Sequence, residues 1–486
     1  MLRFTWPREF FVELIGDRLG WMGVLEGPEL RGIAGQFPYP QGAREPIVSR
    51  RAKLRPATVR RGLFSLQSWF EEARVSVAAK ISPADLPRAD RKPSMNAALD
   101  RMMDFDLTEE QRLVRRTVRE FAEAEILPHV ERYEREERYP IELIAKLPEL
   151  GLMGPMIPEE YGGSFSDVVT YGVICEELAR VDWVIASVVS VANSLVGGSL
   201  LKFGSEAQKQ RYLPGIAKGE ILCSACLTEP RGGTDLGNMD TTATKVDGGF
   251  LLNGTKVFIS HADHAGLFFI VATIDRSLKH KGVTAFVADP REMKGMTIGA
   301  FPMRTLKRDN LAEVHFEDTF VPDEAVLGTP GRGFPVLGSA LDMGRFSVAA
   351  RCVGQSQRAI DLAVPYAMER EAFGQRIGEF QMIQLKIAEM VARTEQARLL
   401  VYRLGRMKDA GIERCSMESS LAKLKASQAA VQNALDGMQV FGGYSVTAEY
   451  EIGRLLMEAK SLEFGEGTTE LHQKLIAEYA LGIRTQ

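Results

Sequence analysis

The chain has 486 residues, of which 45% are apolar and 26% are charged, so it is long enough for several globular domains. Its net charge of −4 gives no reason to expect a nucleic-acid partner. No run of about 18 apolar residues indicates a membrane span, and five scattered cysteines indicate a reducing compartment rather than a disulfide framework.

Residues 1–95 differ in character from everything that follows. They carry 16 Lys/Arg against 10 Asp/Glu, whereas the remainder has a net charge of −10. Such an asymmetry is typical of a tail or a targeting segment, and we expect this basic extension to be poorly ordered. A mitochondrial presequence is one interpretation, although presequences are poor in acids such as Glu9, Glu13 and Asp17. The other is that the native protein starts at Met95, Met102 or Met103.

Residues 104–219 have apolar positions three and four apart, the spacing that predicts helices. Thr108 is followed by two glutamates and is the predicted N-cap of the first helix. Residues 168–204 are so rich in apolar side chains that they predict two nearly buried helices. We therefore predict an N-terminal helical domain over residues 104–219.

The period changes near residue 220 to short alternating or apolar segments, which predict strands. The stretch DGGFLLNGTK, residues 247–256, contains two hairpin turn signals. Cys223 and Cys226 fall in a predicted strand, and one C-x-x-C pair cannot supply the four cysteines of a zinc site. We predict an antiparallel β domain over residues 220–330.

The helical period returns over residues 331–486 and predicts a C-terminal four-helix bundle, so the chain belongs to the α+β class. The pattern breaks around one carboxylate, because Glu466 lies between Gly465 and Gly467. Glycine inside a helix costs about 1 kcal/mol relative to alanine. The break indicates either a solvated turn or a carboxylate on a slim backbone beside a flat ligand.

Several separated motifs across nearly all of residues 104–486 resemble those of the acyl-CoA dehydrogenase family. They are CLTEPRGGTDLGNM, NGTKVFISHA, EREAFGQRIGEFQ, MQVFGGYSV and GEGTTEL. The resemblance implies an N-terminal all-α domain, a middle antiparallel β domain and a C-terminal four-helix bundle. It also implies an FAD-dependent enzyme that converts an acyl-CoA thioester to the 2-enoyl-CoA.

Glu466 is the candidate catalytic base. The α-proton of a thioester is removed by a positioned base, and no side chain accepts the β-hydride, so a cofactor must accept it. By the resemblance, Glu466 abstracts the α-proton and flavin N5 accepts the hydride. Some relatives carry the base at the position of Gly344, so Glu466 has no rival there. From the residues alone, Glu466 as a helix cap is the alternative.

The resemblance assigns the cofactor site to two groups of residues. The group at the flavin ring has Phe258 where relatives mostly have Trp, and Ser260 where they often have Thr; it comprises Cys226, Leu227, Thr228, Phe258 and Ser260. The group at the pyrophosphate and adenosine half of FAD is Arg370, Phe373, Gln381, Gln439, Gly442 and Gly443, with Thr468 as a further FAD contact. Arginine suits phosphate because its planar fork donates two hydrogen bonds.

The resemblance places Thr234, Asp342, Arg345 and Gly467 at the acyl-CoA thioester and its pantetheine channel. From the residues alone, Arg345 could equally be a surface arginine paired with an acid. Relatives that act on glutaryl-CoA carry an arginine at the position of Ala186, and burying a carboxylate without a cation is costly. We therefore expect a neutral short, medium, branched or alicyclic acyl chain, with added room at Gly465, where relatives commonly have Tyr.

The resemblance further implies a homo-oligomer, usually a dimer of dimers, in which a neighbouring subunit completes the FAD site, and an electron-transfer flavoprotein as electron acceptor. We expect a cytoplasmic bacterial enzyme, or a mitochondrial matrix enzyme if the extension is a presequence. An oxidase that passes electrons to O₂ is the alternative, and the lack of an extra C-terminal helical domain favours the dehydrogenase. A third alternative is a catalytically inactive relative that acts as a scaffold. The presence of Glu466, Thr228 and Arg370 together argues against it. His261 and His264 do not have a usual zinc spacing, so we predict no metal site.

Overall fold

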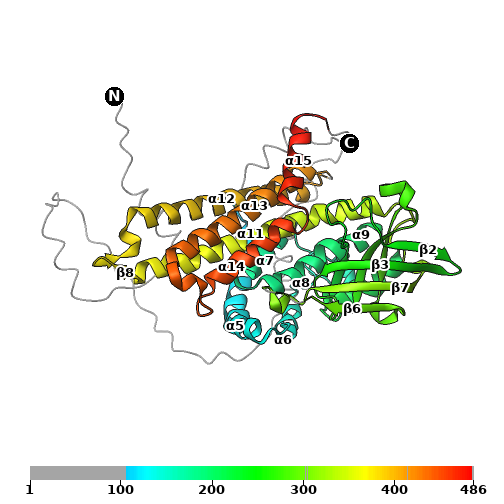
Figure 1. Cartoon of the computed structure of the whole chain (residues 1–486), viewed down its shortest axis with the longest axis horizontal. Helices are drawn as coiled ribbons and strands as arrows, with labels where there is room; N and C mark the ends of the chain where they lie inside the picture. The colour runs from blue at the N-terminus through cyan, green and yellow to red at the C-terminus, as the bar shows by residue number, and fades with distance from the viewer. Residues whose placement is uncertain (1–105, 302, 304, 413, 484–486) are drawn as a thin grey trace, which may run out of the picture. The chain divides into compact units, whose positions relative to one another are not determined.

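The computed structural model describes residues 106–301, 303, 305–412 and 414–483, all within one compact unit of the chain. The expected basic extension, residues 1–95, lies outside the described residues. Along the described chain, helices are followed by a β-sheet and then by long helices (Figure 1). This order confirms the α+β class.

The first helix begins as the sequence predicts. Helix α4 (Glu109–Phe121) continues through the π-helical turn η2 (Ala122–Ile126) into α5 (Leu127–Glu136), and α6 (Ile141–Ile144) follows. The Thr108 hydroxyl accepts a hydrogen bond from the Gln111 backbone N–H at 3.2 Å, and the Gln111 side chain accepts one from the Thr108 N–H at 3.0 Å. This reciprocal capping box satisfies two backbone donors at the helix start.

The next helices are almost completely buried, as predicted. They are α7 (Val168–Val181), α8 (Trp183–Ser190), the π-helical η5 (Val191–Gly197) and α9 (Gly198–Phe203), followed by α10 (Glu206–Ala217). Within the described chain, the continuous stretch Trp183–Phe203 is the one helix whose length and apolar composition would allow a membrane crossing. Because 83% of its apolar window is buried inside the protein, it has the burial of a core helix.

Seven strands form one sheet: β1 (Cys223–Cys226), β2 (Thr242–Val246), β3 (Gly249–Ile259), β4 (Leu267–Thr273), β5 (Val283–Ala288), β6 (Met296–Ala300) and β7 (Ala312–Pro322). Most pairs are antiparallel, but β1 and β2 both pair with β4 in parallel. The sheet is therefore mixed, and the prediction of a purely antiparallel sheet is wrong. Alternation of apolar and polar residues predicts that a segment is a strand, but it does not predict whether the neighbouring strand runs parallel or antiparallel.

One of the two predicted hairpin turns is also wrong. Asp247 and Gly248 do form the tight turn between β2 and β3. Asn253 and Gly254 instead lie inside β3, at a β-bulge where the register with β7 shifts. A Cβ atom on Gly254 would lie 2.6 Å from the Thr241 hydroxyl oxygen, so this glycine permits a close backbone approach rather than a turn.

The C-terminal helices are α11 (Gly333–Glu369), α12 (Gln381–Asp409), α13 (Ser416–Phe441), α14 (Ile452–Phe464) and α15 (Thr469–Ala480). Helices α11 to α14 pack lengthwise and confirm the predicted bundle (Figure 1). A short hairpin, β8 (Glu371–Ala372) with β9 (Gln375–Arg376), connects α11 to α12. The other end of α11 extends to the sheet and lies against β5, which brings the bundle beside the strand ends.

A buried cluster of charges joins the three parts of the described chain. Arg308, which precedes β7 and is fully buried, donates hydrogen bonds to Asp182 at 3.1 Å, to Glu458 at 2.9 Å and to Glu134. These acids lie at the start of α8, in α14 and in α5. A buried arginine is retained where several carboxylates replace its lost hydration, so this cluster holds the helices against the sheet.

Candidate active site

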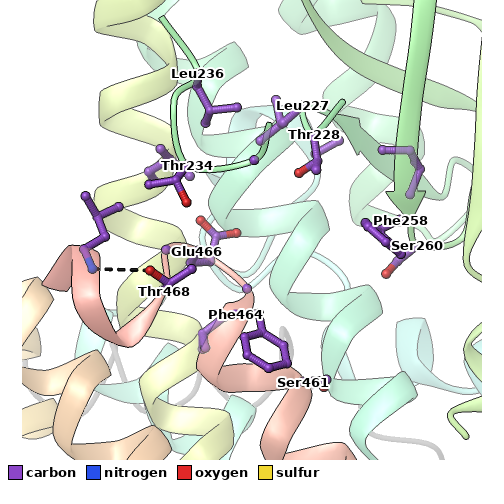
Figure 2. A pocket seen from close by; sticks show the side chains of 18 of the residues that line it. Leu227, Thr228, Thr234, Leu236, Phe258, Ser260, Ser461, Phe464, Glu466 and Thr468 are labelled. Atoms are coloured by element: carbon purple, nitrogen blue, oxygen red, sulfur yellow. Dashed lines mark hydrogen bonds between the residues drawn. The ribbon is translucent and has the colours of Figure 1, made fainter. Parts of the chain in front are cut away.

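A cavity of about 1360 Å³ lies where α11, the α8–η5 helix, the ends of β1 and β3, and the loop between α14 and α15 meet. Figure 2 shows Glu466 projecting into this space near Thr234, with Phe258 and Ser260 extending from the end of β3. Nine of the predicted site residues line the cavity: Leu227, Thr228, Thr234, Phe258, Ser260, Arg345, Glu466, Gly467 and Thr468. Segments more than 200 residues apart in the sequence therefore converge on one space.

Glu466 lies on a four-residue loop, Gly465–Thr468, between α14 and α15. Its backbone is left-handed, with φ of 57°, and Gly467 follows with φ of 110°. The Thr468 hydroxyl accepts a hydrogen bond from the Leu471 N–H at 3.3 Å, so Thr468 is the N-cap of α15. The alternative in which Glu466 caps this helix is therefore wrong.

Gly344 on α11 leaves the space that the Glu466 carboxyl group fills. A Cβ atom at position 344 would lie 2.7 Å from the Glu466 carboxyl carbon, closer than real Cβ contacts. This is the position at which some relatives were expected to carry the base. In this chain a side chain at residue 344 and the Glu466 carboxyl would occupy the same volume.

One oxygen of the partly buried Glu466 side chain lacks a hydrogen-bond partner among the described residues. This Oε2 atom is buried and accepts no hydrogen bond from the residues that the structure describes. Burial raises the pKa of Glu466 to about 7, against the opposing effect of the positive charges on Arg345, Lys423 and Arg351. A carboxylate with such a pKa is a stronger proton acceptor than a solvated one at neutral pH.

Arg345 is buried beside the base rather than lying on the surface. Its Nε donates to the backbone oxygen of Glu466 at 3.3 Å, and its Nη1 donates to Asp342 at 3.2 Å. Asp342 also accepts a hydrogen bond from Ser416 at 3.2 Å and does not line the cavity. The structure thus places Asp342 as the residue that orients Arg345, and the surface-arginine alternative is wrong.

The opposite wall has the features of a site for a flat ring. Phe258 stacks on Phe301, with ring centroids 5.1 Å apart, and remains 60% exposed. The Thr228 hydroxyl makes no hydrogen bond within the described part of the chain, and the Ser260 hydroxyl donates to Asp309 at 3.3 Å. An open aromatic face beside cavity-lining hydroxyls fits a flavin ring, which needs apolar walls and polar edge contacts. Cys226 is fully buried behind this wall and does not line the cavity.

The sequence analysis missed several charged residues of the cavity, among them Asp309 and Arg351. Asp309 is buried, its Oδ1 has no hydrogen-bond partner in the described ranges, and burial raises its pKa to about 7. Arg351 on α11 is also buried and stacks on Trp183, with 4.5 Å from its guanidinium carbon to the ring centroid. The sequence did contain a signal for Arg351, because it interrupts the apolar stretch FSVAARCVG.

The α8–η5 helix forms the remaining wall through residues spaced four apart: Trp183, Ser187, Val191 and Leu195. Ala186, on which the expectation of a neutral acyl chain was based, is fully buried and does not line the cavity. The nearby His261 lies 3.0 Å from the Tyr139 hydroxyl, and His264 stacks on the Tyr139 ring at 4.3 Å. These contacts give both histidines a packing role beside the cavity.

The six residues predicted for the pyrophosphate and adenosine half of FAD do not line the cavity. They lie around the β8–β9 hairpin, at the end of the bundle away from the sheet (Figure 1). All six are exposed, and Phe373 is 98% exposed. The Arg370 guanidinium carbon lies 5.8 Å from the Tyr444 ring centroid, so the hairpin and the turn at Gly442 and Gly443 are neighbours.

Comparisons with known proteins cover the same part of the chain. Family models match the N-terminal domain of acyl-CoA dehydrogenase over residues 108–220, the middle domain over 224–319 and the C-terminal domain over 331–481. An acyl-CoA dehydrogenase of Bacillus subtilis is 38% identical over 377 residues, which span 77% of this chain and 99% of that protein. The mitochondrial short-chain specific acyl-CoA dehydrogenase of Mus musculus is 36% identical over 377 residues, 77% of this chain and 91% of that protein.

Solved structures show the same relationship. The butyryl-CoA dehydrogenase structure from Megasphaera elsdenii has a TM-score of 0.75 and 34% sequence identity, and covers 78% of this chain and 100% of that one. Structural relatives also include FAD complexes, in agreement with the aromatic and hydroxyl-lined wall described above. Together with Glu466 in the cavity, these matches establish that the chain belongs to the acyl-CoA dehydrogenase family, FAD-dependent oxidoreductases that act on CH–CH groups.

Proposed function

We propose that this protein catalyses the α,β-dehydrogenation of a neutral acyl-CoA with Glu466 as the base. The observation that carries the proposal is the Glu466 carboxyl group, which projects into the cavity, has one buried oxygen without a hydrogen bond from the described residues, and has a pKa raised to about 7. A positioned base contributes roughly 10²–10⁴-fold to the rate of such a proton transfer.

Residues on one wall of the cavity would remove the proton, and residues on the other wall would bind the cofactor. Glu466 takes the α-proton, while Arg345 holds the backbone oxygen of Glu466 and fixes the approach of its carboxylate. FAD, when bound, supplies the hydride acceptor that no side chain provides. Phe258, Thr228 and Ser260 would hold the flavin ring by an aromatic face and two hydroxyl groups, and the cavity walls would exclude water from the reacting carbons.

The neutral acyl chain is supported by the walls beside the base. Val191 and Leu195 are apolar, and a Cβ atom on Gly465 would meet only the Ser461 backbone oxygen, at 3.9 Å. This open space suits a short or branched chain. Arg351 lowers the pKa of Asp309, and Asp309 raises the pKa of Arg351, so the two groups partly offset each other beside the substrate space.

The test is anaerobic bleaching of the FAD absorbance by a panel of acyl-CoAs. We expect short or branched neutral thioesters to bleach the purified holoenzyme, and Glu466→Gln to abolish rapid bleaching while retaining FAD. Bleaching by glutaryl-CoA alone would overturn the neutral-chain assignment. If the protein forms peroxide in air as fast as acyl-CoA bleaches it, the protein is an oxidase and the proposal of a dehydrogenase is wrong.

We further propose that the protein is a homo-oligomer, a dimer of dimers, that passes its electrons to an electron-transfer flavoprotein in the bacterial cytoplasm. Support for the oligomer comes from the exposed Phe373, Met382 and Leu385 at one end of the bundle, next to Arg370. Light scattering of the holoenzyme measures the subunit number, and a monomer that retains FAD would overturn this part. Stimulated turnover on adding purified electron-transfer flavoprotein tests the acceptor.

A further inference from the structure

Lys423 on α13 is a fully buried lysine that lies directly behind the loop carrying Glu466. Its Nζ donates one hydrogen bond to the backbone oxygen of Glu463 at 3.0 Å and another to the backbone oxygen of Gly467 at 2.6 Å. These two oxygens lie on either side of Glu466 in the sequence. One ammonium group therefore bridges the two ends of the segment that holds the base.

The two hydrogen bonds of Lys423 stabilise the backbone segment that carries Glu466. The Glu463 carbonyl belongs to the last turn of α14, where carbonyl groups lack partners within the helix and favour a nearby cation. The two residues that follow Gly465 have left-handed backbones, which Glu466 adopts at a cost of roughly 1–2 kcal/mol. Burying an ammonium group is also costly, so retaining one here requires strong compensating contacts.

The contacts hold the backbone of the loop and leave the carboxyl group free. Lys423 binds the carbonyls of Glu463 and Gly467, and Arg345 binds the carbonyl of Glu466. The Glu466 Oε2 atom takes no hydrogen bond from any described residue. A base that must meet a substrate carbon benefits from this division, because its position is fixed while its lone pairs stay available.

Lys423 also acts on Glu466 through its charge. The positive charges facing Glu466 are Arg345 and Arg351 from α11 and Lys423 from α13, and each lowers its pKa. His472 of α15 lies against Gly467, and its pKa is lowered to about 3, so it is neutral at physiological pH.

Two further titratable groups face Lys423. Cys352 of α11 has a thiol whose pKa is raised to about 12 by burial, and Glu463 lies in α14. The thiol is therefore uncharged at neutral pH. Among the three positive charges that act on Glu466, Lys423 is the one that bonds the loop backbone on both sides of it.

We propose that Lys423 is a positioning residue for proton abstraction, which clamps the Glu463 and Gly467 carbonyls and counters the desolvation of the base between them. The inference rests on the proposed role of Glu466. It predicts two separable effects, one of the hydrogen bonds on the position of the carboxylate and one of the charge on the pH at which the carboxylate ionises.

The experiment compares three variants of the holoenzyme. Lys423→Met removes both hydrogen bonds and the charge, whereas Lys423→Gln removes the charge but keeps an N–H donor. Lys386→Met is the matched control, because Lys386 of α12 also contacts α13, through Asp436 at 3.1 Å, but does not contact the loop. FAD content and circular dichroism establish that each variant is folded, and Lys423→Gln carries the test if Lys423→Met does not fold.

The main measurement is exchange of the α-hydrogens of acetyl-CoA with D₂O, followed by mass spectrometry across pH 5–9. Acetyl-CoA has α-hydrogens but no β-carbon, so exchange reports on the base without hydride transfer. We expect Lys423→Met to slow exchange about 10- to 100-fold and to move the midpoint of its rise with pH upward by about one unit. Lys423→Gln should recover part of the rate but keep the raised midpoint, and Lys386→Met should match the wild type.

Unchanged rate and midpoint in Lys423→Met would overturn the inference, as would a lower rate at an unchanged midpoint in both Lys423 variants, which marks a purely structural lysine. The failure of the proposed function is distinguishable from these results. In that case the wild-type protein would catalyse no exchange above that of Glu466→Gln, and it would not bleach with any acyl-CoA.

Discussion

Two groups of residues carry the same family resemblance but lie in opposite surroundings. The base loop around Glu466 is enclosed by α11, α13 and α15, and its contacts to Arg345 and Lys423 come from the same chain. The hairpin group around Arg370 and Phe373 is exposed at the other end of the bundle and does not line the cavity that contains Glu466. One chain therefore surrounds Glu466 by itself, whereas it leaves Arg370 and Phe373 on its surface.

The difference has a physical basis. A base needs desolvation to have a raised pKa, and the interior of one subunit provides it. Residues that bind a charged phosphate need donors but can remain on the surface until a second surface covers them. The comparison therefore supports the proposal that a neighbouring copy completes the hairpin end, and the following predictions test each end separately.

The largest effect is expected from Glu466→Gln. Loss of the base should slow acyl-CoA-dependent flavin bleaching by roughly 10²–10⁴-fold, measured by anaerobic stopped flow. FAD content should stay at the wild-type level, because the hairpin end is untouched. Glu470→Gln, in the exposed first turn of α15, is the matched control, and an equal loss in that variant would show that the effect is not specific to the base.

The next effect is on stability against pH. Burial raises the folded-state pKa of Glu466 from 4.5 to about 7, so the folded state binds a proton more tightly than the unfolded state. The contribution of Glu466 to the free energy of unfolding should therefore fall, by up to about 3 kcal/mol, as pH rises from about 4.5 to 7, and be flat above. Urea unfolding of wild type and Glu466→Gln measures the difference, and identical pH profiles would contradict the enclosed carboxyl group.

Gly344→Ala tests how closely the enclosure fits the base. The added Cβ would overlap the Glu466 carboxyl carbon at 2.7 Å and push the carboxylate away from its position. A displacement of about 1 Å costs on the order of 10²-fold in rate. Gly299→Ala in β6, where a Cβ would meet no atom within 4 Å, is the control and should leave the bleaching rate unchanged.

The smallest effect is expected at the exposed end. Arg370→Gln should weaken retention of FAD by about 10- to 100-fold, since a hydrogen bond to a charged group is worth about 1.5–3 kcal/mol. The bleaching rate per bound FAD should stay at the wild-type value. Arg376→Gln, in the same hairpin, is the control, and flavin fluorescence after dilution gives the affinity. A reduced bleaching rate with unchanged affinity would contradict the separation of the two ends.

Much of the fold could be predicted because local signals and tertiary structure agree. Thr108 has a capping box, and the apolar residues of α7 and α8 are buried as their composition predicts. The parallel pairing of β1 with β4 and the bulge at Gly254 could not be predicted, since they depend on which strand lies alongside. A Gly that follows Asn has the same sequence signal in a turn as in a bulge.

The candidate site shows the same limit. The motifs predicted Glu466 and the cavity residues Thr228, Phe258 and Ser260, whereas Asp309 and Arg351 had no motif to mark them. Their burial depends on the packing of α11 against the ends of the strands. Lys423 was likewise invisible in the sequence, because it acts on backbone carbonyls of residues about 40 positions away.

The order of helices and strands, the family and the candidate base were predicted from the sequence alone, because periodicity and motif spacing are local properties of the chain. The tertiary structure decided which groups are deprived of water and what each of them touches. Desolvation and hydrogen bonding depend on distances in space, so the raised pKa of Glu466, the room left by Gly344 and the clamp of Lys423 follow only from the fold.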